Sequence, residues 1–165
     1  MLGRTRGGAG SETRPSAPAP CRCSRGLLAA SAGSSQALTK PAFVARGNAI
    51  CESYYRRLNR LALPAMTMSG LAAYEREQLP LALTEQKELE AVVPPAADRQ
   101  TYRTWLGVEE SVVGVIKKII VGGDRNDAVA MNRLIARAEA LERSYDALAA
   151  KLGLSVCAQP TTQTK

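Results

Sequence analysis

The chain has 165 residues and a formal net charge of +7, a length that fits one domain and an appendage. Apolar residues make up 45% of the sequence but aromatic residues only 4%, which favours a core of close-packed aliphatic helices. The sequence contains no histidine, which excludes Ser-His-Asp and Cys-His catalytic systems and every zinc, haem or di-iron site that needs an imidazole ligand.

The positive charge lies mostly near the N-terminus. Residues 1–40 contain six Lys or Arg and one Glu, whereas residues 41–157 contain fifteen basic and fourteen acidic side chains. The second segment is nearly neutral, which argues against nucleic-acid binding by the folded part. An anionic membrane or a nucleic acid could still contact the basic N-terminal segment, whose charges are dispersed over Arg4, Arg6, Arg14, Arg22, Arg25 and Lys40.

Residues 1–38 predict a disordered tail or a degenerate export signal. They are rich in Gly, Ser, Ala, Pro and Arg and lack a sustained apolar pattern. Arg22 and Arg25 precede a short apolar run that ends in Ala30-Ser31-Ala32, the small-x-small form of a signal cleavage site. The run is shorter than the ~7 apolar residues of a signal peptide, so it predicts a signal remnant or a misplaced start codon. No stretch reaches the ~20 apolar residues of a transmembrane helix.

The first amphipathic helix is predicted from Thr39, a capping residue, to a point before Pro64. Charged side chains occupy the other faces of this segment. Its inward-facing residues recur at steps of three and four: Phe43, Gly47, Ile50, Tyr54, Leu58 and Leu61.

The second helix is predicted from Thr67 or Ser69 to Val93, where Pro94-Pro95 stops it. Pro80 lies inside this helix, where it removes a backbone hydrogen bond, so a kink is expected there. The apolar face consists of Leu71, Leu79, Ala82, Leu83, Leu89 and Val93.

The third helix is predicted from about Ala96 to Val121 and is expected to end at Gly122-Gly123. The β-branched run Val112–Val121 is also compatible with a strand, but the length and spacing of the apolar residues favour a helix. Those residues are Tyr102, Trp105, Val108, Val112, Ile116, Ile119 and Ile120.

The fourth helix follows a capping signal formed by Asp124 and Asp127, and Gly153 is suited to a left-handed C-terminal cap. Its stripe comprises Met131, Leu134, Ile135, Ala138, Leu141, Tyr145, Leu148 and Leu152. Four long helices joined by short loops predict an all-α, up-down-up-down four-helix bundle over residues 39–157. A disordered C-terminal tail is predicted over residues 158–165.

A disulfide bond between Cys51 and Cys157 is compatible with this topology. The first helix begins and the fourth ends at the same end of the bundle, and Cys51 lies about 15 Å along the first helix. If Gly153 reverses the chain, the next four residues can cover most of that distance at about 3.3–3.6 Å each. The alternative is that both cysteines are buried, free and reduced. Cys21 and Cys23 lack two further ligands for a soft metal and are predicted to be unstructured tail cysteines.

Several segments resemble one group of proteins. They are the segment that begins with Leu38–Lys40 and ends with Asn48–Cys51, and the shorter segments Tyr55–Leu58, Leu79–Ala82, Gly123-Asp124 and Leu152–Cys157. Over about residues 38–157, the chain resembles small uncharacterised exported proteins and lipoproteins of high-GC Gram-positive bacteria. The resemblance implies an extracytoplasmic helical bundle with a terminal disulfide, and it implies no activity. The sequence departs from that family at its front, where a long apolar leader or a lipid-modified cysteine is expected.

These features predict a non-enzymatic, extracytoplasmic or secreted binding or interaction module, with a cytoplasmic location as the alternative. No catalytic residue, cofactor or metal site is predicted, and the only site residues are the disulfide pair Cys51 and Cys157. The expected partner is an unknown protein or a small apolar ligand admitted by a gap at the Pro80 kink. A simple bend that wraps the helix around the core is the other interpretation of Pro80.

The alternative hypothesis is a carboxylate-based enzyme or metal binder. The only paired acids worth naming are Glu85 with Glu88 and Glu109 with Glu110. Adjacent residues on a helix point in different directions, and Glu85 and Glu88 are expected on a solvated face. Inward-facing, buried carboxylates with strongly raised pKa values would favour this hypothesis.

Overall fold

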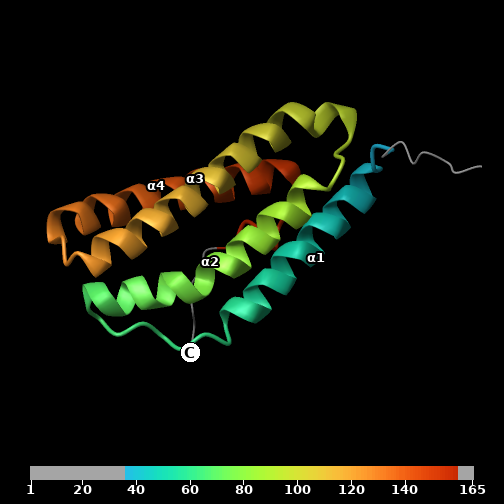
Figure 1. The fold of residues 1–165 in the computed structure, drawn as a ribbon. Helices are drawn as coiled ribbons and strands as arrows, with labels where there is room; N and C mark the ends of the chain where they lie inside the picture. The colour runs from blue at the N-terminus through green and yellow to red at the C-terminus, as the bar shows by residue number, and fades with distance from the viewer. Residues whose placement is uncertain (1–35, 160–165) are drawn as a thin grey trace, which may run out of the picture. The chain divides into compact units, whose positions relative to one another are not determined.

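The computed structural model describes residues 36–159 and shows four α-helices in that range (Figure 1). They are α1 (Lys40–Leu58), α2 (Met68–Glu90), α3 (Arg99–Asp124) and α4 (Ala128–Leu152), with a short 3-10 turn, η1 (Ala96–Asp98), before α3. The helices pack against one another, which confirms the predicted all-α bundle. Within the described range, no helix combines the length and the apolar character needed to cross a membrane.

The predicted helix caps are confirmed except for Asp124, which ends α3 and pairs with Arg76 instead of capping α4. The side chains of Thr39, Thr67 and Asp127 each accept a hydrogen bond from the backbone N–H three residues further on. Gly153 adopts a φ of 76° and ends α4 in the left-handed conformation that favours glycine.

The prediction that Gly122-Gly123 ends α3 is wrong. Both glycines are buried in the last turn of the helix. A Cβ on Gly123 would lie 2.6 Å from the carbonyl oxygen of Met68 and 2.6 Å from the Cβ of Ala72. The glycine therefore allows the start of α2 to approach α3 closely, and the chain turns only afterwards, at Asn126 with a φ of 54°.

Replacing Gly123 with alanine is expected to lower the free energy of unfolding by about 1–3 kcal/mol, because the new methyl group meets backbone atoms. Gly114 in the same helix is the matched control, since no atom lies within 4 Å of the position that its Cβ would take. Gly114→Ala is expected to raise stability by about 0.5–1 kcal/mol through helix propensity alone. Urea denaturation of both variants measures the contrast, and equal effects would contradict the close approach at Gly123.

Two predicted apolar positions are solvent-exposed instead. Leu83 on α2 is 42% exposed and Ile135 on α4 is 39% exposed. The helix α1 ends at Leu58, earlier than expected. The helix α2 also ends earlier than predicted, at Glu90, and Figure 1 shows its axis changing direction near the middle, in keeping with a bend at Pro80.

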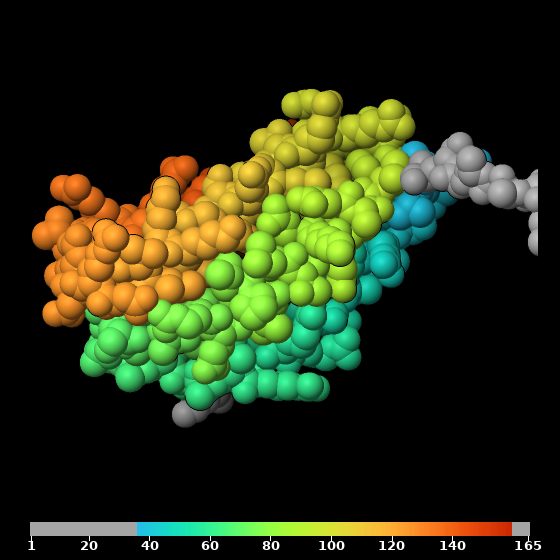
Figure 2. All heavy atoms as spheres, viewed as in Figure 1, coloured from blue at the N-terminus to red at the C-terminus, as the bar shows by residue number. Residues whose placement is uncertain are grey.

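The helices α1 and α4 are joined partly by the C-terminal segment, whereas the other neighbouring helices pack directly on each other. The helix α1 packs mainly on α2, and α4 packs mainly on α3, whereas direct packing between α1 and α4 is sparse. The surfaces of α2 and α3 meet along the face shown in Figure 2. At one end of the α1–α4 seam lie residues 154–159, and the N–H of Val156 donates to Oδ1 of Asn48 at 3.0 Å.

The C-terminal segment, residues 154–159, is fixed by the predicted cysteine pair. Cys51 and Cys157 form a disulfide bond with an S–S distance of 2.08 Å, and both side chains are fully buried. The hydroxyl of Tyr55 donates to the carbonyl oxygens of Cys157 and Gln159 at 3.4 and 3.5 Å. Residues 158 and 159, which were predicted to belong to the C-terminal tail, therefore lie against the bundle. The predictions for Cys21, Cys23, the export signal and residues 160–165 fall outside the described residues.

Candidate ligand-binding site

A cavity opens where the first helix is too short to complete the bundle. With 19 residues, α1 is roughly 28 Å long, whereas α3 with 26 residues is roughly 39 Å long. Beyond Leu58 three helices continue, and the loop of residues 59–67 takes the place of the fourth. There the side chains line a cavity of about 650 Å³ that is partly open to solvent, with Leu63, Pro64 and Met66 of the loop at its edge. That volume lies within the usual range for small-molecule sites.

The lining combines apolar walls with tyrosines and acids, and no Lys or Arg side chain is among the lining residues. The aromatic members are Tyr54, Tyr55, Tyr74 and Tyr145. The acidic members are Glu75, Glu85, Glu109, Glu142 and Asp146. The principal apolar members are Leu58, Leu71, Val112, Val115, Ile116 and Ile119.

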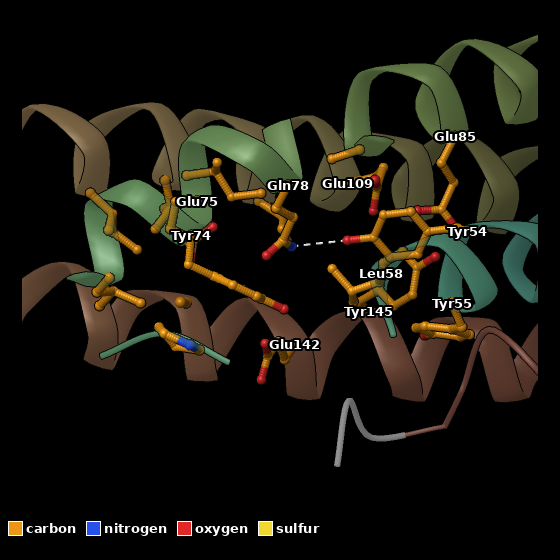
Figure 3. A pocket seen from close by; sticks show the side chains of 18 of the residues that line it. Tyr54, Tyr55, Leu58, Tyr74, Glu75, Gln78, Glu85, Glu109, Glu142 and Tyr145 are labelled. Carbon is orange, nitrogen blue, oxygen red and sulfur yellow. Dashed lines mark hydrogen bonds between the residues drawn. The ribbon is translucent and has the colours of Figure 1, made fainter. Parts of the chain in front are cut away.

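Glu85 of α2 and Glu109 of α3 form an inner acidic pair. Their side chains are only 3% and 5% exposed. Among residues 36–159, no hydrogen bond or ion pair joins either carboxyl group to another side chain. Figure 3 shows both carboxyl groups at the same end of the cavity as Tyr54 and Tyr145, whose pKa values respond to both acids.

Burial changes the protonation of this inner acidic pair. Burial raises the pKa of Glu85 well above its usual value of 4.5; the neighbouring Glu109 and then Glu88 raise it further, while the positive charge of Arg57 opposes the rise. Burial likewise raises the pKa of Glu109 to about 7. Full ionisation of the pair is therefore unfavourable, because two bare carboxylates in this apolar environment would repel each other.

A second pair of acids lies at the other end of the cavity (Figure 3). Burial raises the pKa of Glu75 to about 7, and the negative charge of Glu142 contributes to the rise. One carboxyl oxygen of Glu75 is buried without a hydrogen-bond partner, whereas Glu142 is exposed to solvent. Solvent therefore reaches the cavity at Glu142, while one oxygen of Glu75 stays buried.

The tyrosines supply neutral hydroxyl groups and ring faces. Burial raises the pKa values of Tyr54 and Tyr145, so both phenols stay protonated at neutral pH. The hydroxyl of Tyr54 accepts a hydrogen bond from Nε2 of Gln78 at 2.9 Å. The ring of Tyr145 packs at a tilt of 36° against Trp105, with ring centroids 4.8 Å apart. The inner end of the cavity is therefore built on the aromatic part of the core.

The prediction that Glu85 lies on a solvated face is wrong. Glu85 is buried, Glu88 is half-buried and does not line the cavity, and Glu110 is exposed while its neighbour Glu109 points inward. A signal was present in the sequence, because Gln78, Ala82, Glu85 and Leu89 share one inward stripe of α2 at steps of three and four. Glu109 similarly continues the stripe of Tyr102 and Trp105 on α3.

The arrangement suits an organic molecule better than a metal ion. The described residues include no group of three or more cysteine and acidic side chains placed to hold a metal ion. The apolar walls can pack against a hydrophobic body, and the buried acids can meet a hydrogen-bond donor or a positive charge.

Comparisons with protein-family models, curated proteins and solved structures found no match to this chain.

Proposed function

We propose that this protein is a non-enzymatic binding protein that holds a small, mostly apolar molecule in the cavity between its helices. The observation that carries this proposal is the cavity of about 650 Å³ in the half of the bundle where α1 is missing. The cavity leaves apolar side chains uncovered between the helices, and a small apolar molecule would cover them. Gln78 and Ala82, each two residues from Pro80, lie on the cavity wall, which supports the interpretation of the Pro80 bend as a gap between helices.

We further propose that the protein works in an oxidising, extracytoplasmic compartment. The disulfide between Cys51 and Cys157 supports this location, because such bonds persist mainly outside the reducing cytosol. The sequence resemblance to exported proteins of high-GC Gram-positive bacteria points the same way.

The binding proposal is tested with an uncharged fluorescent probe, N-phenyl-1-naphthylamine. The wild-type protein is expected to bind it with increased fluorescence, since the probe leaves water for an apolar site. Ala138 lines the cavity, so Ala138→Phe fills part of it and is expected to weaken binding by about tenfold or more. Ala136, exposed on the same helix, provides the matched control Ala136→Phe, which should leave binding unchanged. Absence of probe binding, or equal loss in both variants, would contradict the proposal.

The second candidate function is a carboxylate-based enzyme. The specific observation in its favour is the buried pair Glu85 and Glu109, because an acid with a pKa near 7 can act as a general acid or base. Against it, no Lys or Arg lines the cavity, so a reaction that develops negative charge there would lack a cation to stabilise it. Recovery of a bound ligand chemically unchanged supports binding over catalysis.

A further inference from the structure

We propose that the ligand is an organic cation, an amine or quaternary ammonium group on an apolar body, and that its positive charge sits against the inner acidic pair Glu85 and Glu109. This inference rests on the proposed binding function and specifies the chemistry of the ligand. It is argued from the unpartnered acids, the aromatic rings beside them and the absence of a basic side chain from the cavity wall.

Two buried carboxyl groups on the cavity wall have no hydrogen bond or salt bridge to a described side chain, although the charge of Arg57, which does not line the cavity, acts on Glu85. Glu85 and Glu109 are each at least nine-tenths buried and line the cavity, yet neither accepts a hydrogen bond from a described side chain. Burying a carboxyl group without a partner is costly, so such a group in a native protein calls for an explanation. A cation in the cavity would supply the charge that the walls do not.

Aromatic and apolar side chains surround the inner acidic pair. Tyr54 and Tyr145 lie at the same end of the cavity as the two acids (Figure 3). Tyrosine ring faces attract organic cations, and sites for quaternary ammonium groups commonly use several of them. The apolar side chains of Ile116, Val112 and Leu58 then provide contacts for the hydrophobic body. A small inorganic cation would gain nothing from these apolar walls.

The protonation of the pair links binding to pH. On α1, the positive charge of Arg57 lowers the pKa of Glu85, and the neutral phenols of Tyr54 and Tyr55 lie near both acids. On α2, the negative charge of the half-buried Glu88 raises the pKa of Glu85. The titratable groups that face the cavity from α4 are Tyr145, Glu142 and Asp146. Burial raises the pKa values of both acids, so a cation that binds the ionised carboxylates competes with protons for them. Affinity for the cation should therefore rise with pH until the free pair has lost these protons.

The experiment compares three probes of nearly the same shape by isothermal titration calorimetry. They are 2-(1-naphthyl)ethylamine, its trimethylammonium derivative and the uncharged 2-(1-naphthyl)ethanol. Both cations are expected to bind at least about tenfold more tightly than the alcohol at pH 7.5, and their affinity should rise about tenfold from pH 5.5 to pH 7.5. Titrations in buffers of different ionisation enthalpy should show proton release for both cations. The trimethylammonium probe carries no titratable proton, so a proton released with it comes from the protein.

The variants Glu85→Gln and Glu109→Gln keep the shape of the side chains and remove the charge. Each should reduce the preference for the cations over the alcohol and diminish proton release, whereas Glu110→Gln, on the exposed face next to Glu109, should change neither. Both cavity variants should stay folded, because they remove a buried charge, and circular dichroism checks this.

The outcomes separate the two proposals. Equal or tighter binding of the alcohol, or a preference that survives in both cavity variants, overturns the cation inference and leaves the binding function in place. Loss of the preference only on Glu142→Gln also overturns it, because the cation would then sit at the exposed mouth. Failure of all three probes, together with the uncharged fluorescent probe, overturns the binding function itself.

Discussion

The double variant Cys51→Ala with Cys157→Ala is expected to lower the free energy of unfolding by about 3–4 kcal/mol. The bond joins residues 106 apart in the sequence, so it removes much conformational freedom from the unfolded chain. At the size of this domain the loss corresponds to a fall in Tm of about 10–15 °C. Thermal unfolding of the oxidised wild type and the variant, followed by circular dichroism, measures it.

The effect of the missing disulfide should extend to the ligand cavity. Without it, the C-terminal segment keeps only its packing and a few hydrogen bonds, including those from Tyr55. Gln159 belongs to this segment and also lines the cavity, so probe binding should weaken as well. Cys21→Ser with Cys23→Ser is the control and should leave Tm unchanged. Four reactive thiols per chain in protein from an oxidising compartment would contradict the bond.

The variant Glu109→Gln is expected to be more stable than the wild type at pH 8 by about 3 kcal/mol and nearly equal to it at pH 4.5. The carboxyl of Glu109 has a pKa of about 7 in the folded protein against 4.5 in its ordinary state. The folded protein therefore binds more protons between these values, so the wild type loses stability as pH rises from about 4.5 to 7. Glutamine carries no charge at any of these pH values, so it avoids this loss.

Urea denaturation at pH 4.5, 6, 7 and 8 tests the sign as well as the size of this effect. Part of the gain comes from Glu85, whose pKa should fall once its acidic neighbour is gone. Glu110→Gln, one residue away and exposed, is expected to show no pH-dependent difference from the wild type. If the wild type were more stable than Glu109→Gln at pH 8, the prediction would be wrong, and the carboxylate of Glu109 would have a stabilising partner in solution.

Most of the bundle could be predicted from the sequence because its signals are local. Thr39, Thr67 and Asp127 cap the helix starts as their positions indicate, and Gly153 ends α4 in the left-handed conformation. The role of Gly123 in the close contact between α2 and α3 could not be predicted from such local signals. A glycine pair has the same sequence pattern at a helix end and at a close helix contact, and only the position of α2 distinguishes them.

The cavity was harder to predict because it depends on the early end of α1 relative to the other three helices. The end of α1 at Leu58 leaves a half-bundle of three helices, and periodicity on one helix does not reveal the length of its neighbours. The general preference of acids for solvent predicts Glu85 on an exposed face, although both Glu85 and Glu109 occupy inward stripe positions. A charged residue that interrupts an apolar stripe is thus a better sign of a buried acid than a pair of adjacent acids.

The covalent link between Cys51 and Cys157 also determines how the protein would carry mechanical load. If the described chain were pulled from its two ends, tension would pass along residues 36–51, through the sulfur atoms and out through residues 157–159. Residues 52–156, which include all of α2, α3 and α4, would lie outside that path. The helices that wall the cavity would keep their length under a force that stretches the ends, and reducing the bond would bring them under tension.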